Sequence, residues 1–262
     1  MSHKSNTVGT ANSEINIAVV NISTVVSNDE VEKAMSDLQT QVTRDFYPIW
    51  GLNAQLTFYA KQSDIPKGQW WITVSDNSDQ AGAGGYHDLT DEGKPLGKVF
   101  AKTDMESGSK WTVAFSHELL EMLEDPYINI AAEFEEDNGN AFMVGYEMCD
   151  PVEDDQFGYK IGSTLVSDFL LPEYFENSKH PPNTKYDFMD KIKKPLEILS
   201  GGYLGVQKFN GQGWQQITSS KSKQSATKIY ASRPRVGSRR ERRNTRRSQW
   251  AWSDPRPIKK KL

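Results

Sequence analysis

Cysteine is almost absent from this chain of 262 residues, in which Cys149 is the only one. A single cysteine excludes an internal disulfide, a cysteine-based zinc site and a thioredoxin-type motif. Long hydrophobic runs are also missing, because the longest, residues 15–22, is interrupted by Asn16 and Asn21. We therefore expect no transmembrane helix, no secretory signal peptide and no membrane partner. A cytoplasmic protein is expected, or a virion-associated one if the source is a phage.

Charge is distributed unevenly along the chain. Residues 218–262 contain 15 Lys and Arg against 2 Asp and Glu, a net charge of +13. The preceding 217 residues contain 16 basic and 33 acidic residues, a net charge of −17. Such asymmetry predicts an acidic folded domain over residues 14–217 and a disordered basic tail over residues 218–262. Residues 1–13, rich in Ser, Asn and Thr, are expected to be disordered.

Hydrophobic periodicity over the acidic part predicts an α+β domain. β-Branched runs indicate strands at residues 15–22, 55–60 and 70–75, and a helix with N-cap candidates at residues 27–29 should run until Pro48 and Gly51 stop it. Glycines surround an expected edge hairpin within residues 82–101. A second helix should cover residues 110–125. After it we expect a hairpin of residues 132–136 and 141–149, a strand over 159–166 and a closing hairpin that ends at residue 217.

The helix of residues 110–125 carries the sequence His117-Glu118-Leu119-Leu120-Glu121. Side chains four residues apart lie one above the other, so His117 and Glu121 can converge on one metal ion. Glu118 lies about 100° around the helix, where it could hold a water molecule next to that ion. Zinc hydrolases use this geometry, with two helical residues as ligands and the intervening glutamate as general base.

In these residues and in the order of its elements, the chain over residues 15–125 resembles the zincin metallopeptidases. In that family a small twisted mixed sheet with a backing helix precedes an active-site helix bearing H-E-x-x-H. The resemblance implies a zinc peptidase that cleaves peptide bonds in a peptide or protein substrate, with Glu118 as general base. Glu121 stands where the family has its second histidine, which makes this chain a gluzincin-like H-E-x-x-E variant. A carboxylate ligand reduces the positive charge of the site and should weaken the metal as a Lewis acid.

The third metal ligand has several candidates. Glu147 follows Glu121 by 26 residues, a separation similar to that of the glutamate ligand in gluzincins, and we prefer it. Asp150 is the next choice, and His87, on the expected edge hairpin, is a third. Acidic residues between 133 and 155 could instead hold Ca²⁺ through oxygen ligands. Tyr146, Tyr159 and Tyr174 remain open as donors to an oxyanion.

A second hypothesis assigns the function to the tail. Acidic residues along one arc of a helix are usually a solvated surface, in which case the folded domain would be a non-catalytic module. Arg and Lys neutralise phosphates and exposed indoles stack on unpaired bases, so the protein would then be a structural component of a virion or nucleoid that binds nucleic acid. The tail residues that would do so are Arg239, Arg240, Arg242, Arg243, Arg246, Arg247, Trp250 and Trp252.

Overall fold

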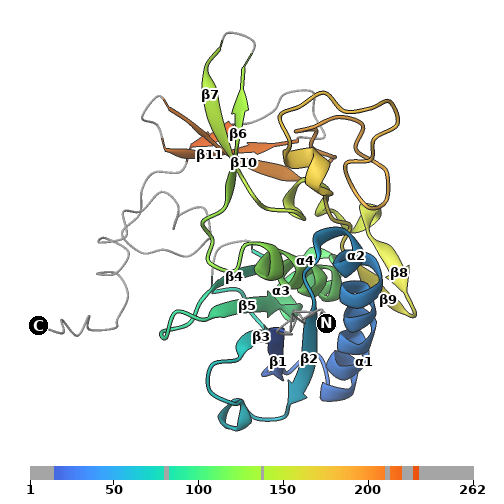
Figure 1. The fold of residues 1–262 in the computed structure, drawn as a ribbon. Helices are drawn as coiled ribbons and strands as arrows, with labels where there is room; N and C mark the ends of the chain where they lie inside the picture. The colour runs from blue at the N-terminus through green and yellow to red at the C-terminus, as the bar shows by residue number, and fades with distance from the viewer. Residues whose placement is uncertain (1–14, 80–82, 137–138, 210–212, 220–226, 230–262) are drawn as a thin grey trace, which may run out of the picture.

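The computed structural model describes residues 15–79, 83–136, 139–209, 213–219 and 227–229. In this part of the chain the architecture is mixed α+β, with two five-stranded sheets, one two-stranded sheet and short helices. Figure 1 shows the first sheet in the lower half of the molecule and the second in the upper half. The α+β class expected from the sequence is confirmed, whereas the expected disorder of residues 1–13 lies outside the described residues.

The first sheet has the strand order β2-β1-β3-β5-β4. Strands β1 (Ile15–Asn21), β2 (Ala54–Tyr59), β3 (Trp70–Ser75) and β5 (Pro95–Phe100) are mutually parallel. Strand β4 (Gly85–Leu89) runs antiparallel to β5 at the edge of the sheet. The interior strand β1 contains a continuous buried run, which a parallel strand covered on both faces requires. The sheet is thus mixed, as the sequence predicts.

The first helical stretch crosses from β1 to β2. Helix α1 (Asn28–Thr40) begins with a capping box in which Ser27 and Glu30 satisfy each other's backbone amides. A π-helical segment, η1 (Gln41–Phe46), follows, and α2 (Tyr47–Trp50) completes the stretch. The prediction that Pro48 helps to stop the helix is wrong. The π-type hydrogen bonds shift the backbone register just before Pro48, so the missing amide of Pro48 does not interrupt the helix. The helix ends at Gly51, which has a φ of 69°.

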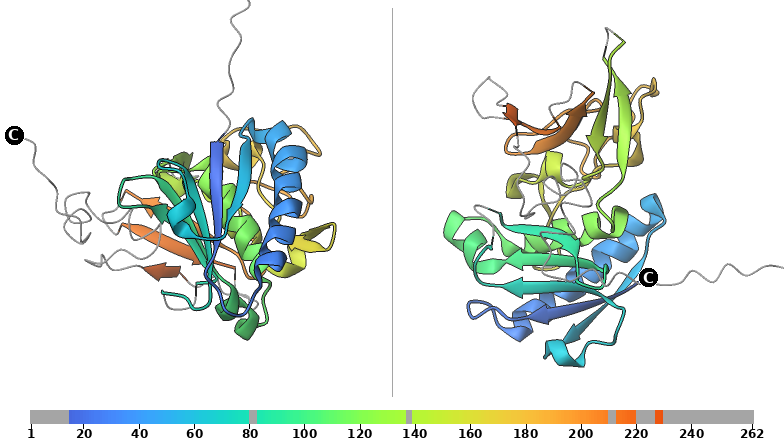
Figure 2. Two further views of the ribbon diagram at one scale, coloured as in Figure 1. Left: turned by 90° about the horizontal axis from the view of Figure 1, so that it is seen from below. Right: turned by 90° about the vertical axis from the view of Figure 1, so that its left-hand side faces the viewer.

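Helix α4 (Trp111–Glu124), preceded by α3 (Ala101–Ser107), lies between the two sheets in Figure 1 and in the right-hand view of Figure 2. It packs against β4 and β5 of the first sheet and against β9. A buried hydrogen-bond network anchors it: the Ser116 hydroxyl donates to Gln41 Oε1 at 2.6 Å and accepts from the Ser167 amide at 3.0 Å. Gln41 Nε2 donates in turn to the Ser167 carbonyl at 2.9 Å. Polar groups buried in this way fix the rotation of α4 about its axis.

The second sheet is antiparallel, with the strand order β12-β11-β10-β7-β6. Its strands are β6 (Ala131–Glu135), β7 (Ala141–Gly145), β10 (Tyr203–Lys208), β11 (Trp214–Thr218) and β12 (Thr227–Ile229). The two expected hairpins are therefore present, although β7 is shorter than residues 141–149. Strand β12, which lies within the expected basic tail, pairs with β11 at the edge of this sheet.

The single strand expected over residues 159–166 is instead a hairpin. Strands β8 (Tyr159–Ile161) and β9 (Thr164–Val166) are antiparallel. The chain reverses at Gly162, whose φ of 57° lies in the left-handed region that glycine adopts at little cost. The reversal allows β9 to cover α4, which a straight strand of eight residues could not do.

Four short 3-10 helices complete the described structure: η2 (Gln62–Asp64), η3 (Asp150–Val152), η4 (Asp155–Phe157) and η5 (Pro172–Phe175). The irregular segment after β9 is held by two buried carboxylates. Asp168 accepts from the amides of Phe169 and Met189, and Asp187 accepts from those of Lys191 and Ile192. These hydrogen bonds satisfy backbone groups that no sheet pairs.

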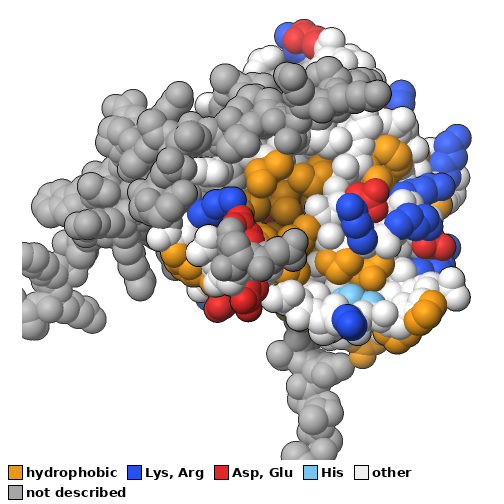
Figure 3. Space-filling view, turned by 90° about the horizontal axis from the view of Figure 1, so that it is seen from above, with side chains coloured by type: hydrophobic (Ala, Val, Ile, Leu, Met, Phe, Trp, Pro, Cys, Tyr) orange, Lys and Arg blue, Asp and Glu red, His pale blue; other side chains and the backbone are white. Residues whose placement is uncertain are grey.

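An unusual number of carboxylates is buried. Asp and Glu are almost never fully buried unless they have partners. Among the described residues, ten acidic side chains are nevertheless buried: Asp45, Asp104, Glu118, Glu121, Glu124, Asp125, Glu147, Asp150, Asp168 and Asp187. Figure 3 shows the upper face, where hydrophobic side chains gather near the middle and acidic ones are scattered. Part of the acidic excess of the folded domain therefore lies inside it, around α4.

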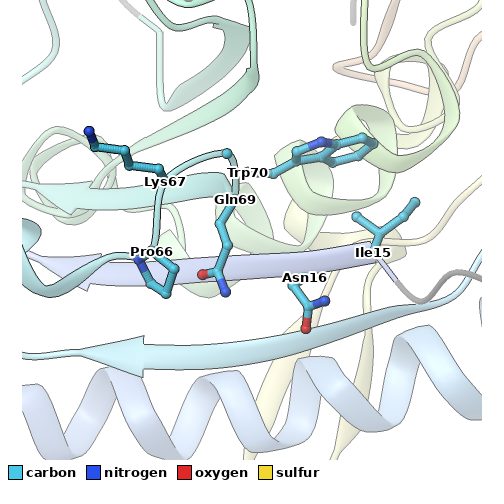
Figure 4. A pocket seen from close by; sticks show the side chains of 7 residues that line it. Ile15, Asn16, Pro66, Lys67, Gln69 and Trp70 are labelled. Carbon is cyan, nitrogen blue, oxygen red and sulfur yellow. The ribbon is translucent and has the colours of Figure 1, made fainter.

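A hollow of about 440 Å³ opens elsewhere on the surface, at the beginning of β1 and β3 (Figure 4). Its only ionisable side chain is that of Lys67, and none of the acidic or histidine residues discussed below lines it. We therefore assign it no chemistry.

No helix in the described part of the chain combines the length and hydrophobicity needed to cross a bilayer.

Candidate metal centre

The two residues that the helical spacing brings together do converge. His117 Nε2 lies 3.3 Å from Glu121 Oε2, and both side chains are buried. A third group comes from outside the helix, because Asp150 Oδ1 lies 3.2 Å from the same His117 nitrogen. Atoms that share one tetrahedral ion at bond lengths of ~2.1 Å lie about 3.4 Å apart. The contacts of His117 Nε2 with Glu121 Oε2 and with Asp150 Oδ1 are each close to this spacing.

The loop after β7 supplies the acidic side chains that face the helix. Asp150 begins η3, and Pro151 at its first turn fixes the backbone there. Glu147, Glu121 and Asp150 form a second group whose ligand atoms lie within 4.8 Å of one another. Both candidates preferred from the sequence are thus in the cluster, and Asp150 is the one that reaches His117 directly.

Glu153 also joins the cluster, in a group with His117 and Asp150, and sequence reasoning had not counted it as a ligand. A signal was present in Asp150-Pro151-Val152-Glu153. Residues three apart in a 3-10 turn eclipse one another, so Asp150 and Glu153 share a face.

Glu118 lies beside these groups, turned toward the edge of the first sheet. Its Oε2 is 3.4 Å from Nδ1 of His87 on β4, and the same nitrogen is 3.8 Å from Glu121 Oε2. Gly85 allows β4 to approach, because a Cβ at this position would lie 2.8 Å from Glu118 Cγ and 2.9 Å from the Lys98 carbonyl oxygen. No ordinary side chain fits there without displacing the strand or Glu118.

The carboxylate of Glu121 is oriented from both ends. Its Oε1 accepts a hydrogen bond from the Cys149 amide at 3.1 Å, which leaves Oε2 toward the two imidazoles. The Cys149 side chain is fully buried, and burial raises the pKa of its thiol well above the usual range. A thiol that resists ionisation is a poor nucleophile, so Cys149 belongs to the core of the site.

Electrostatics show what the cluster requires. Burial alone lowers the pKa of His117, but the charge of Glu121 and the hydrogen bonds that the imidazole donates to Asp150 and Glu121 outweigh it and raise the pKa well above its ordinary value. In the absence of a metal, a proton on this imidazole supplies positive charge among the buried carboxylates. Several carboxylates in a low dielectric are costly unless a cation compensates them. A divalent metal ion bound by the nitrogen of His117 and the oxygens of Glu121 and Asp150 would compensate this buried negative charge.

Asp104, at the beginning of α3, is a further buried carboxylate near the cluster that sequence reasoning missed. Burial, together with the charge of Asp155, raises its pKa to about 7, while His117 opposes the shift. The isolated acid in a helix of seven residues carries no pattern that could have marked it in the sequence.

Two of the tyrosines that were open as oxyanion donors have structural roles. The Tyr174 hydroxyl donates to the Glu197 carbonyl at 3.0 Å, and the Tyr159 hydroxyl donates to Asp45 at 2.9 Å. Asp125, two turns from His117, accepts from the amides of Asn129 and Ile130 and so holds the turn that follows α4. The hydroxyls of Tyr159 and Tyr174 are thus engaged in holding the fold, which speaks against their use as oxyanion donors.

Tyr146 stacks on Phe175 with ring centroids 3.9 Å apart, and burial raises its pKa to about 12. A hydroxyl that keeps its proton retains the ability to donate a hydrogen bond.

The residues named for nucleic-acid binding, Arg239 to Trp252, lie outside the described residues.

Comparison of the chain with protein-family models, with curated proteins and with solved structures gives no match. The His/Glu/Asp cluster and its surroundings therefore carry the functional assignment alone.

Proposed function

We propose that the protein is a metal-dependent hydrolase, and that its reaction is the cleavage of peptide bonds. The observation that carries the proposal is the buried contact of His117 Nε2 with Glu121 and Asp150, at 3.3 and 3.2 Å, beside Glu118. Carboxylates on a solvated helix face would remain in water, where no desolvation cost arises.

The donor set favours Zn²⁺. Catalytic zinc sites have three protein ligands from nitrogen and oxygen donors and keep one position for water or substrate. Ca²⁺ takes six to eight oxygen ligands, so the imidazole at the centre of this cluster makes it the weaker choice. We propose His117, Glu121 and Asp150 as the ligands, with Glu147 behind them.

Each residue of the proposed site would then have its own role in the reaction. When bound, the metal would polarise the scissile carbonyl group and lower the pKa of a water molecule. Glu118 accepts the proton of the attacking water and returns it to the leaving amine. His117, Glu121 and Asp150 hold positions set by α4 and η3, and the Cys149 amide keeps Glu121 oriented.

The fold supports the same proposal. A mixed sheet and the helix α1 precede the His-Glu helix α4, as the resemblance to zincins implies. Glu118 lies next to the proposed ligand Glu121, where the resemblance places the general base. We propose a zincin-like H-E-x-x-E peptidase on this basis.

Metal content is the direct test. Full-length protein purified without chelator and dialysed against metal-free buffer should contain one zinc per chain by elemental analysis. Because the metal binds the folded state, a large excess of EDTA should lower the melting temperature by about 10 °C. EDTA saturated with zinc beforehand is the control and should leave melting unchanged. Protein with neither zinc nor another transition metal would contradict the proposal.

The basic tail supports a second candidate function, association with nucleic acid, because residues 218–262 carry a net charge of +13. Changing the six arginines of residues 239–247 to glutamine should weaken binding of single-stranded RNA or DNA at least tenfold at 150 mM salt. The salt slope of log K should fall by up to about 4, at ~0.7 for each lost phosphate contact. Fluorescence anisotropy measures both.

The matched control removes the same charge from exposed lysines of the folded domain: Lys160, Lys179, Lys185, Lys191, Lys193 and Lys194. That variant should retain most of the affinity. Equal losses in the two variants would show that net charge alone, and not the tail, controls binding.

A further inference from the structure

A second group of ligand atoms lies next to the proposed metal centre. It consists of His87 on β4 and of Glu118 and Glu121 on α4, whose donor atoms all lie within 4.8 Å of one another. His87 Nδ1 is 3.4 Å from Glu118 Oε2 and 3.8 Å from Glu121 Oε2. All three residues are buried, His87 with an exposed fraction of only 1%. These separations are close to the ~3.4 Å expected for ligands that share one tetrahedral ion.

The two groups meet at a single atom. Glu121 Oε2 lies 3.3 Å from His117 Nε2 on one side and 3.8 Å from His87 Nδ1 on the other. Carboxylates that face two ions in this manner occur in two-metal sites, whose ions are ~3.5–4 Å apart. The strand that carries His87 can approach Glu118 closely because Gly85 has no Cβ to collide with it.

We propose that His87, Glu118 and Glu121 form a second divalent-cation site that shares Glu121 with the first. Two divalent ions that share one carboxylate repel each other, so the second ion binds more weakly than the first. It exchanges with solution at zinc concentrations that leave the first site full. The second site is empty after dialysis and fills when metal is in excess.

Filling the second site has a consequence that rests on the proposed function. A cation bound to Glu118 lowers the proton affinity of its carboxylate, which makes Glu118 a weaker base toward water. Excess metal therefore suppresses hydrolysis, and His87 determines the concentration at which it does so. The site regulates the reaction through the general base, without displacing the first metal.

Titration of full-length protein, first stripped of metal with EDTA and then dialysed, with ZnCl₂ by isothermal calorimetry tests the second site without any substrate. Wild type should bind two ions, the second at least tenfold more weakly than the first. His87→Gln should retain the first event and weaken the second at least tenfold. Glu118→Gln should do the same, which covers the case in which His87→Gln fails to fold. His180→Gln is the matched control, since His180 lies on a loop and contacts the Glu176 carbonyl, and it should retain both events.

The outcomes separate the two proposals. A single tight ion in wild type, unchanged in His87→Gln, overturns the second site and leaves the proposed hydrolase intact. Two ions that both persist in His87→Gln and Glu118→Gln also overturn it, because the weaker ion would then lie elsewhere. No bound ion in wild type contradicts the proposed function as well.

Discussion

Glu118→Gln should lower kcat/KM for peptide hydrolysis by about 1,000-fold, while one zinc per chain remains after dialysis. General base catalysis contributes 10²–10⁴-fold, and glutamine has the same shape but cannot accept the proton. Glu118 is not among the three ligands proposed for the first metal, so the tight ion should stay. The measurement is the cleavage rate of the best substrate from a fluorogenic peptide library, with elemental analysis of the same sample.

The control for this variant is Glu124→Gln. Glu124 is also a buried glutamate of α4 but is not among the grouped ligand atoms, so its replacement should change the rate less than tenfold. This comparison separates the loss of the base from the loss of a buried charge. Full hydrolysis by zinc-loaded Glu118→Gln would contradict the role of Glu118.

Replacement of the proposed third ligand should release the metal. Asp150→Asn should weaken zinc binding at least 100-fold, because a neutral amide replaces the carboxylate that lies 3.2 Å from His117 Nε2. Loss of the metal should also abolish the fall in melting temperature that EDTA causes in wild type. Competition with a chromogenic zinc chelator measures the affinity.

Glu147→Gln is the matched variant, since Glu147 is equally buried and belongs to the same cluster. We expect it to weaken zinc binding less than tenfold. The opposite order, with metal lost in Glu147→Gln and retained in Asp150→Asn, would restore the ligand preferred from sequence spacing.

Local features of the chain could be predicted because they depend on neighbouring residues. The strands β1, β2 and β3 follow from β-branched runs, and α4 follows from its apolar stripe and from Pro126 after it. The sequence predicts one strand where the structure has the hairpin β8-β9, because two strands of three residues are too short for hydrophobic periodicity to separate, although Gly162-Ser163 is a two-residue turn sequence. The sequence predicts that Pro48 helps to stop the helix, because a π-helical segment has no recognised pattern in sequence.

For the site as well, only the part that depends on neighbouring residues could be predicted. His117, Glu118 and Glu121 are fixed relative to one another by the geometry of a helix, which any sequence with this spacing would share. Asp150, Glu147 and His87 were open alternatives, since each lies on another element at a distance that spacing cannot supply. The burial of the acidic face was the reverse of the usual expectation for such a helix.

The sequence by itself determined the elements and the pairing of His117 with Glu121, because both are set by interactions within a few residues. Only the tertiary structure decided that this acidic face is buried and that Asp150 completes it from η3. It also decided that His87 approaches from β4. These outcomes depend on how the sheet, the helix and the loop after β7 pack, and packing joins residues that are far apart in the chain. The same packing keeps water from the carboxylates, and their need for a cation follows from that burial.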